Sequence, residues 1–147
     1  MNLQIVNADL LTADTDYIVH QCNSSHNRNV GLSSAISKIY PKANIYNGKY
    51  EAINRIPGTI IIRDKVIAMI AQVSPGKPKK PETKLYREQL FQSCLDEIAK
   101  IPNIESIAFP YCIGCGLAGG DWDKYLTMIS NWSIVNPHII VKIYRLT

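Results

Sequence analysis

Short apolar segments alternate with amphipathic ones along this chain, and this alternation constrains its fold more than any other feature. Residues 17–22, YIVHQC, are almost continuously apolar, which is typical of a strand in a sheet that helices cover on both faces. Residues 84–101 instead form the clearest amphipathic helix, with one apolar side made of Leu85, Leu90, Phe91, Cys94, Leu95 and Ile98. Strands that alternate with helices predict a three-layer α/β/α domain.

The other elements follow from the same two periodicities. Strands are expected at residues 3–6, 58–64, 65–72, 106–110 and 138–146, and helices at 32–40, 43–53 and 122–132. The strands 58–64 and 65–72 are predicted to form a hairpin that turns near Asp64 and Lys65. A chain of 147 residues has the size of one ordinary domain, so residues 1–147 are predicted to form a single domain.

The composition predicts a protein without membrane-spanning segments. Hydrophobic residues make up 46% of the chain, but every apolar segment is far shorter than the roughly 20 residues of a transmembrane helix. The N-terminus, MNLQIVNADL, lacks the basic and apolar regions of a signal peptide. We therefore expect a cytoplasmic protein that makes no membrane contact, with four free thiols at Cys22, Cys94, Cys112 and Cys115.

Cys112 and Cys115 form a C-x-x-C pair, which leaves open a zinc site or redox chemistry. A structural zinc site needs four ligands, and no second Cys/His pair has matching spacing. A thioredoxin-like pair would open a helix, whereas this pair lies between a strand end and a glycine-rich segment. We favour thiols that suit a tight site, and we expect neither a metal nor a cofactor.

The net charge of +4 is positive but small, and it does not by itself indicate a nucleic-acid-binding protein. Positive residues do cluster in the segment 77–87, as Lys77, Lys79, Lys80, Lys84 and Arg87. This segment is interpreted as a solvated loop followed by the exposed first turn of a helix. A rim that attracts a small polyanion is the alternative.

The segment FPYCIGCGLAGGDW, residues 109–122, contains four glycines directly after an apolar strand: Gly114, Gly116, Gly119 and Gly120. Their backbone N–H groups can approach a phosphate or a ribose closely, because no side chain obstructs them. A tight strand-to-helix turn that needs positive φ is the alternative. The polar segment 23–31 also follows an apolar strand, so both loops are expected to converge at the carboxyl ends of the strands, where α/β sheets bind ligands.

Five segments together resemble the macrodomain family, whose members bind ADP-ribose. They are NADL (7–10), VHQCN (19–23), NVGLSSAI (29–36), IAQ (70–72) and IAFPYCIGCGLAGGDW (107–122), in the order that the family has them. The resemblance is closest to the small branch that processes ADP-ribose 1″-phosphate or removes ADP-ribose from proteins. It implies a three-layer α/β/α macrodomain-like fold with a central mixed sheet.

The resemblance also implies roles for individual residues. Asp9 would accept a hydrogen bond from the adenine amino group, unless it only caps the turn in which it lies. Asn23 would contact the distal ribose, unless it only ends its strand with an Asx turn. The residues implied to bind the ligand are Asp9, Leu10, Gln21, Asn23, Gly31, Leu32, Gln72, Pro110, Ile113, Gly114, Cys115, Gly116 and Leu117.

The chain departs from the family pattern at three positions. Asn29 stands where the first phosphate loop of the family has a glycine, whereas Gly31 matches that loop. Related hydrolases that release ADP-ribose from glutamate use a lysine and an aspartate, and Gln72 and Ala118 occupy those positions here. These two departures argue against the lysine-dependent mechanism.

Two residues are candidates for catalysis. His20 lies three residues before Asn23, and a yeast-type relative has a histidine at the matching position; a core histidine bonded to a backbone carbonyl is the alternative. Asp121 lies at the start of a helix, where a carboxylate is favoured, so a simple N-cap is its alternative.

The resemblance therefore implies a metal-independent, monomeric phosphatase that converts ADP-ribose 1″-phosphate to ADP-ribose and phosphate, with His20 and Asp121 handling protons. Removal of ADP-ribose from modified protein or nucleic acid is the alternative among enzymes. A module that binds ADP-ribose without turnover is the alternative outside them. A nucleic-acid module that uses the segment 77–87 is a weaker one.

Overall fold

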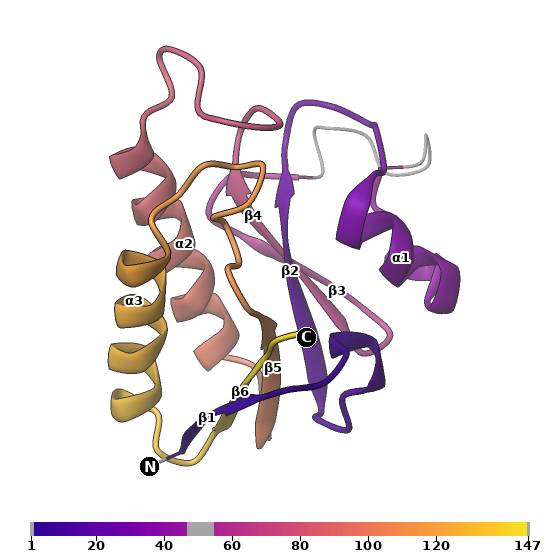
Figure 1. The fold of residues 1–147 in the computed structure, drawn as a ribbon, viewed down its shortest axis with the longest axis vertical. Helices are drawn as coiled ribbons and strands as arrows, with labels where there is room; N and C mark the ends of the chain where they lie inside the picture. Colours follow the sequence, from indigo (N-terminus) through magenta and orange to yellow (C-terminus); the bar gives the residue numbers. More distant parts are fainter. Residues whose placement is uncertain (1, 47–54, 147) are drawn as a thin grey trace.

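The computed structural model describes residues 2–46 and 55–146. In this part of the chain, strands join into one sheet with the order β1-β6-β5-β2-β4-β3 (Figure 1). The strands are β1 (Leu3–Val6), β2 (Tyr17–Asn23), β3 (Ile60–Arg63), β4 (Val66–Gln72), β5 (Ser106–Pro110) and β6 (Ile140–Tyr144). Neighbouring strands are parallel except β3 and β4, so the predicted mixed sheet is confirmed.

The antiparallel pair is the predicted hairpin. Arg63 of β3 lies opposite Val66 of β4, so Asp64 and Lys65 form a two-residue turn. Asp64 has a φ of 53°, a left-handed conformation that aspartate tolerates better than most residues. The turn residues therefore agree with the turn that the sequence predicts.

Helices cover both faces of the sheet. α2 (Lys84–Ala99) and α3 (Trp122–Val135) lie side by side on one face, and α1 (Gly31–Ile39) lies on the other (Figure 1). Two short 3₁₀ helices lie on the side of α1: η1 (Leu10–Thr12) between β1 and β2, and η2 (Pro41–Ala43) directly after α1. The predicted three-layer arrangement is confirmed.

Successive residues of the central strands face the two helical layers in turn. Val19 of β2 and Ile67 of β4 belong to the core under α2 and α3, which also holds Phe91. Ile18, one residue earlier in β2, belongs to the core under α1 together with Ile36. Since both faces are buried, residues 17–22 need an apolar side chain at almost every position.

The buried stripe of α2 differs from the prediction at two residues. Leu85 is exposed, whereas Arg87 is only 2% exposed, so the interpretation of Arg87 as part of an exposed first turn is wrong. The stripe begins at Arg87 and continues at Leu90 and Phe91, at helical spacing. Leu85 lies two positions before Arg87, which places it on nearly the opposite side of the helix.

The helix predicted over residues 43–53 is absent from its described part. Ala43 ends η2, and Asn44 has extended backbone angles. The side-chain oxygen of Asn44 accepts a hydrogen bond from the Tyr46 N–H at 3.0 Å, and such local bonds compete with helix formation. The rest of that predicted helix, 47–53, lies outside the described residues. No helix in the ranges 2–46 and 55–146 is long and apolar enough to cross a membrane.

Candidate functional site

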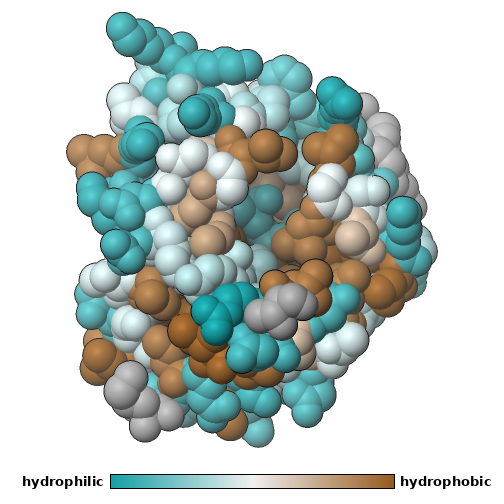
Figure 2. Space-filling view, in the orientation of Figure 1, coloured by the Kyte–Doolittle hydropathy of each residue, from teal (hydrophilic) through white to brown (hydrophobic). Residues whose placement is uncertain are grey.

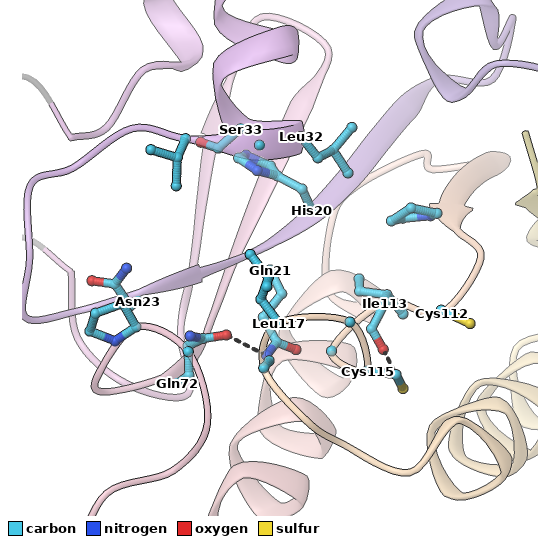
Figure 3. Close-up of a pocket in the computed structure, with 18 of the residues that line it drawn as sticks. His20, Gln21, Asn23, Leu32, Ser33, Gln72, Cys112, Ile113, Cys115 and Leu117 are labelled. Atoms are coloured by element: carbon cyan, nitrogen blue, oxygen red, sulfur yellow. Dashed lines mark hydrogen bonds between the residues drawn. The ribbon is translucent and has the colours of Figure 1, made fainter.

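A pocket of about 760 Å³ opens at the carboxyl ends of β2, β4 and β5. Figure 2 shows the hollow on this face, with hydrophobic residues along its edge, and Figure 3 shows the side chains inside it. Both loops that the sequence predicts to converge line this pocket, as does the start of α1. Its volume lies within the range of about 300–1,000 Å³ that small-molecule sites occupy.

The glycine-rich loop forms one wall, and its glycines differ in why they are glycine. Gly114 and Gly119 have φ values of 75° and 74°, which side chains rarely adopt. A Cβ on Gly120 would lie 2.5 Å from the carbonyl oxygen of Gly114. Gly116 has neither constraint, since open space surrounds it. The turn geometry therefore explains three of these glycines, while Gly116 lines the pocket with its backbone unobstructed.

The same loop leaves some of its backbone N–H groups unused. Gly119 donates to the Gly116 carbonyl at 3.1 Å, and Gly120 donates to the Gly114 carbonyl at 3.0 Å. Within the described residues, the N–H groups of Gly116, Leu117 and Ala118 have no protein acceptor. Amides of this kind are available to an anionic ligand.

Helix α1 begins at the pocket, where Gly31, Leu32 and Ser33 are among the lining residues. Its N-cap residue, Val30, makes no side-chain capping bond. The first N–H groups of a helix have no intrahelical partner, and the helix dipole places positive potential there. The pocket therefore has a second wall that favours negative charge.

His20 lies inside the pocket near the start of α1 (Figure 3). It is buried, and this burial lowers the pKa of its imidazole to about 4. Its ring nitrogens lie 3.5 and 3.6 Å from the sulfur of Cys22, a thiol whose pKa burial raises to about 12. Among the described residues, no backbone carbonyl accepts a hydrogen bond from His20, so a core histidine bonded to a backbone carbonyl does not describe its contacts; the Cys22 thiol is its polar partner. At neutral pH the pocket thus holds an uncharged imidazole, with one donor and one acceptor nitrogen.

Two amide side chains connect neighbouring strands at the base of the pocket. Gln21 of β2 donates from Nε2 to Oε1 of Gln72 of β4 at 2.7 Å (Figure 3). Gln72 in turn donates to the Ser74 carbonyl at 2.9 Å. The Oε1 atom of Gln21 is buried without a partner, and a Cβ on Gly114 would lie 2.9 Å from it. This close approach is a further reason for a glycine at 114.

Asn23, at the end of β2, both lines the pocket and closes the turn that follows. Its Oδ1 accepts from the His26 N–H at 3.0 Å, which matches the turn-forming alternative for this residue. The buried Arg55 donates to the carbonyls of Asn23 and His26 at 3.0 and 2.7 Å, and its guanidinium lies over the Tyr46 ring. These hydrogen bonds from Arg55 therefore fix the backbone of the polar loop after β2.

No protein-family model and no curated protein matches this sequence. Among solved structures, the macrodomain of Mycobacterium tuberculosis DarG matches with a TM-score of 0.80 and 20% sequence identity, over 97% of this chain and 96% of that chain. The chain has the macrodomain fold.

Two further structures support this conclusion. A protein of unknown function from Bacteroides thetaiotaomicron is 26% identical, with a TM-score of 0.73 over 98% of both chains. An Oceanobacillus iheyensis macrodomain with ADP is 21% identical, with a TM-score of 0.70 over 97% of this chain and 82% of that chain. A mutant of that macrodomain has been solved with ADPR.

The macrodomain fold brings most of the predicted site residues together. Those that line the pocket are His20, Gln21, Asn23, Gly31, Leu32, Gln72, Pro110, Ile113, Gly114, Cys115, Gly116 and Leu117. Their roles toward a ligand remain predictions.

Three predicted residues do not line the pocket. Asp9 is the N-cap of η1, where its Oδ1 accepts from the Leu11 N–H at 2.9 Å, and Leu10 is buried in the core under α1. Asp121 is exposed at the N-cap of α3, where its side chain accepts from the Asp123 N–H at 3.0 Å. For Asp9 and Asp121, the capping alternatives therefore describe their contacts in this structure.

Sequence reasoning did not assign several lining residues to the site: His26, Arg28, Val30, Ser33, Tyr46, Pro75, Gly76, Tyr111, Cys112 and Ala118. Pro75 and Gly76 follow β4, so their position at the carboxyl end of a parallel strand was a usable signal. No sequence signal pointed to Tyr46, because it comes from a distant segment. Its hydroxyl accepts a hydrogen bond from the backbone N–H of Asn23 at 2.9 Å.

The C-x-x-C pair, Cys112 and Cys115, lies in the wall of this pocket. Burial raises the pKa of the Cys115 thiol to about 12, and its sulfur donates to the Ile113 carbonyl at 3.2 Å. A thiol in this state is a poor nucleophile at neutral pH. No group of three or more His, Cys, Asp or Glu side chains within the described ranges is placed to hold a metal ion.

Proposed function

We propose that the pocket binds ADP-ribose. The proposal depends on one observation: the unused amides of the glycine-rich loop and the uncapped N-terminus of α1 line the same pocket of about 760 Å³. Both features favour an anion, and the diphosphate of ADP-ribose is one. The Oceanobacillus iheyensis structures with ADP and with ADPR, which share this fold, support the assignment.

Isothermal titration with ADP-ribose tests this proposal. We expect one site per chain, with weaker binding of AMP because AMP lacks the second phosphate and the distal ribose. Ribose 5-phosphate, a ribose with one phosphate, serves as the matched control ligand for the distal half of ADP-ribose. An absence of ADP-ribose binding at millimolar concentration would contradict the proposal.

We further propose that this site hydrolyses ADP-ribose 1″-phosphate. The observation that favours turnover is His20, a buried and uncharged imidazole among the lining residues. In the proposed step, water attacks C1″ while the bond from C1″ to the phosphate oxygen breaks, and phosphate leaves with the bonding electrons. The acceptor nitrogen of His20 takes the proton of the water and passes it to the departing phosphate. A bound phosphate anion would raise the pKa of the imidazole and assist this transfer.

The resemblance also gives Asp121 a part in proton transfer, and a test of this role needs a variant that separates chemistry from helix capping. Asp121→Ser keeps an oxygen that can cap α3 but removes the carboxylate, whereas Asp121→Ala removes both. If only the loss of the cap matters, Asp121→Ser should turn over substrate like the wild type.

Phosphorus NMR of ADP-ribose 1″-phosphate, in buffer with a metal chelator, tests the hydrolysis. Release of inorganic phosphate by the wild type but not by His20→Gln would support the phosphatase. Binding without product would favour the non-catalytic module. Release of ADP-ribose only from modified protein or nucleic acid would favour the macromolecular hydrolase.

A further inference from the structure

Arg87, in the first turn of α2, is a buried cation that joins three segments of the chain. Its Nη1 donates to the Gly76 carbonyl at 2.6 Å and to the Ala118 carbonyl at 3.2 Å. Its Nη2 donates to the Ser74 carbonyl at 2.9 Å and to Glu82 at 2.9 Å. Only 2% of the residue is exposed, so these bonds are protected from water.

Two of these acceptors belong to different segments of the pocket lining. Gly76 lies in the connection from β4 to α2, and Ala118 lies in the glycine-rich loop after β5. One guanidinium therefore spans the two segments. Both carbonyls accept from the same nitrogen, Nη1, while Nη2 bonds the Ser74 carbonyl. Because a guanidinium is planar with donors at fixed angles, it fixes where the Ala118 carbonyl lies relative to Gly76 and Ser74 of the β4–α2 connection.

Glu82 bonds both Arg87 and the start of the β4–α2 connection. Its carboxylate accepts from the Val73 N–H at 2.7 Å, from the Ser74 hydroxyl at 2.7 Å and from Arg87. Burial acts to raise the pKa of Glu82, but the bonds from Arg87, Val73 and Ser74 outweigh it and hold the pKa at about 2. The pair thus stays charged across the pH range in which the protein would work.

We propose that the Arg87–Glu82 pair is a positioning device that sets the spacing between the β4–α2 connection and the glycine-rich loop, and thereby the affinity of the pocket for its ligand. Neither residue lines the pocket, so the pair acts through the backbone it holds. This inference rests on the proposed function for its ligand, ADP-ribose. The hydrogen bonds through which Arg87 links the two segments are present in the structure without any ligand.

The variant Arg87→Lys tests the proposal because it keeps the charge and removes the fork. A lysine ammonium is a point donor, so it cannot hold the Gly76 and Ala118 carbonyls, which bond Nη1, and at the same time the Ser74 carbonyl and Glu82, which bond Nη2. We expect Arg87→Lys to bind ADP-ribose about tenfold more weakly than the wild type, the size of effect typical of residues that orient a site from outside it. In the ligand-free protein, amide hydrogen exchange should become faster together at Ser74, whose N–H donates to Glu82, and at Gly119 and Gly120, whose N–H groups donate within the glycine-rich loop.

Lys124→Gln is the matched control. The exposed ammonium of Lys124 lies 3.8 Å from the carboxylate of Glu88, the residue after Arg87, in an ion pair between α3 and α2. This variant should change neither the affinity nor the exchange. If Arg87→Lys fails to fold, Glu82→Gln removes one charge of the pair with little change in shape and should produce the same two effects.

The outcomes separate this inference from the proposed function. Wild-type affinity and unchanged exchange in a folded Arg87→Lys protein would overturn the positioning role. Faster exchange at only one of the two segments would overturn it as well. If the wild type itself does not bind ADP-ribose, the proposed function fails, and the exchange measurement still decides whether Arg87 couples the two segments.

Discussion

His20 is kept uncharged by its burial, and this makes the fold sensitive to acid. Its pKa falls from 6.5 to about 4 on folding, so between these values the unfolded chain binds a proton that the folded chain does not. The stability that the uncharged His20 contributes is therefore fully present above pH 6.5 and is lost as the pH falls toward 4. We expect His20 to account for a loss of about 3 kcal/mol in the free energy of unfolding between pH 7 and pH 4, measured by urea titration.

The control for this prediction is His138→Gln, which changes an exposed histidine outside the pocket. It should retain the pH dependence, whereas His20→Gln should remove most of it. Equal slopes in the two variants would show that His20 is charged or exposed in solution.

Gly116 and Gly120 lie four residues apart, and we expect opposite consequences from the same substitution. Gly120→Ala places a Cβ 2.5 Å from a backbone oxygen and should cost about 2 kcal/mol or more. A Cβ at Gly116 would have open space around it, and Gly116 has no positive φ. The free energy of unfolding of Gly116→Ala, measured by thermal unfolding, should therefore stay within about 1 kcal/mol of the wild type. The new methyl group should instead weaken ADP-ribose binding in a titration. Normal affinity in Gly116→Ala would mean that the ligand does not approach this backbone.

The glycine pattern could be found in the sequence, but the reason for each glycine could not. The neighbours of Gly114 are Gln21 and Tyr125, which belong to β2 and α3. A local motif contains no information on such long-range contacts. The motif therefore predicted a ligand loop and a tight turn as alternatives, and the structure contains the geometry of both.

Helix α1 lacks a capping side chain at Val30, and this allows a test at the scale of the element. Val30→Asp and Val30→Asn both supply a capping oxygen and should stabilise the helix by about 1 kcal/mol in thermal unfolding. The aspartate also places a negative charge at the pocket and should weaken ADP-ribose binding about fivefold or more relative to the asparagine. Equal affinities of the two variants would exclude an anion at this helix terminus.

The periodic patterns predicted most elements, but one charged residue of α2 was misplaced. Leu90, Phe91 and their helical neighbours mark the buried side correctly. Arg87 belongs to that side only because carbonyls of Gly76 and Ala118 and the carboxylate of Glu82 meet there. No periodic rule for a single helix can anticipate acceptors that come from other segments.

Asn2 connects the beginning of the chain to its last helix and strand, which makes it a test of the molecule as a whole. Its Nδ2 donates to the carbonyls of Ser133 and Ile139, each at 2.8 Å. Asn2→Ala leaves both carbonyls without this donor and should lower the free energy of unfolding by about 1–3 kcal/mol in urea titration. Asn131→Ala, on the exposed side of α3, should change it by less than about 0.5 kcal/mol. A wild-type midpoint for Asn2→Ala would mean that water replaces the bonds at no cost.

At the scale of the whole molecule, the alternation of strands and helices was enough to predict the three layers and the end of the sheet that carries the pocket. It could not fix how each loop side chain points. Asp9 and Asp121 lie in the segments that the resemblance identified, yet both carboxylates accept bonds from their own helix termini. Loop direction depends on such local competition, which the order of the elements does not determine.

The place of β1 in the sheet has a consequence for how the chain is made. β1 is an edge strand whose partner in the sheet is β6, the strand that lies farthest from it in sequence among the described residues. On the ribosome, β1 must therefore wait until β6 has emerged before the two strands can pair. The hairpin of β3 and β4 needs no such delay. We expect nascent chains that end before residue 140 to expose β1 as an unpaired segment. Such a segment is open to cleavage by a protease and to binding by a chaperone.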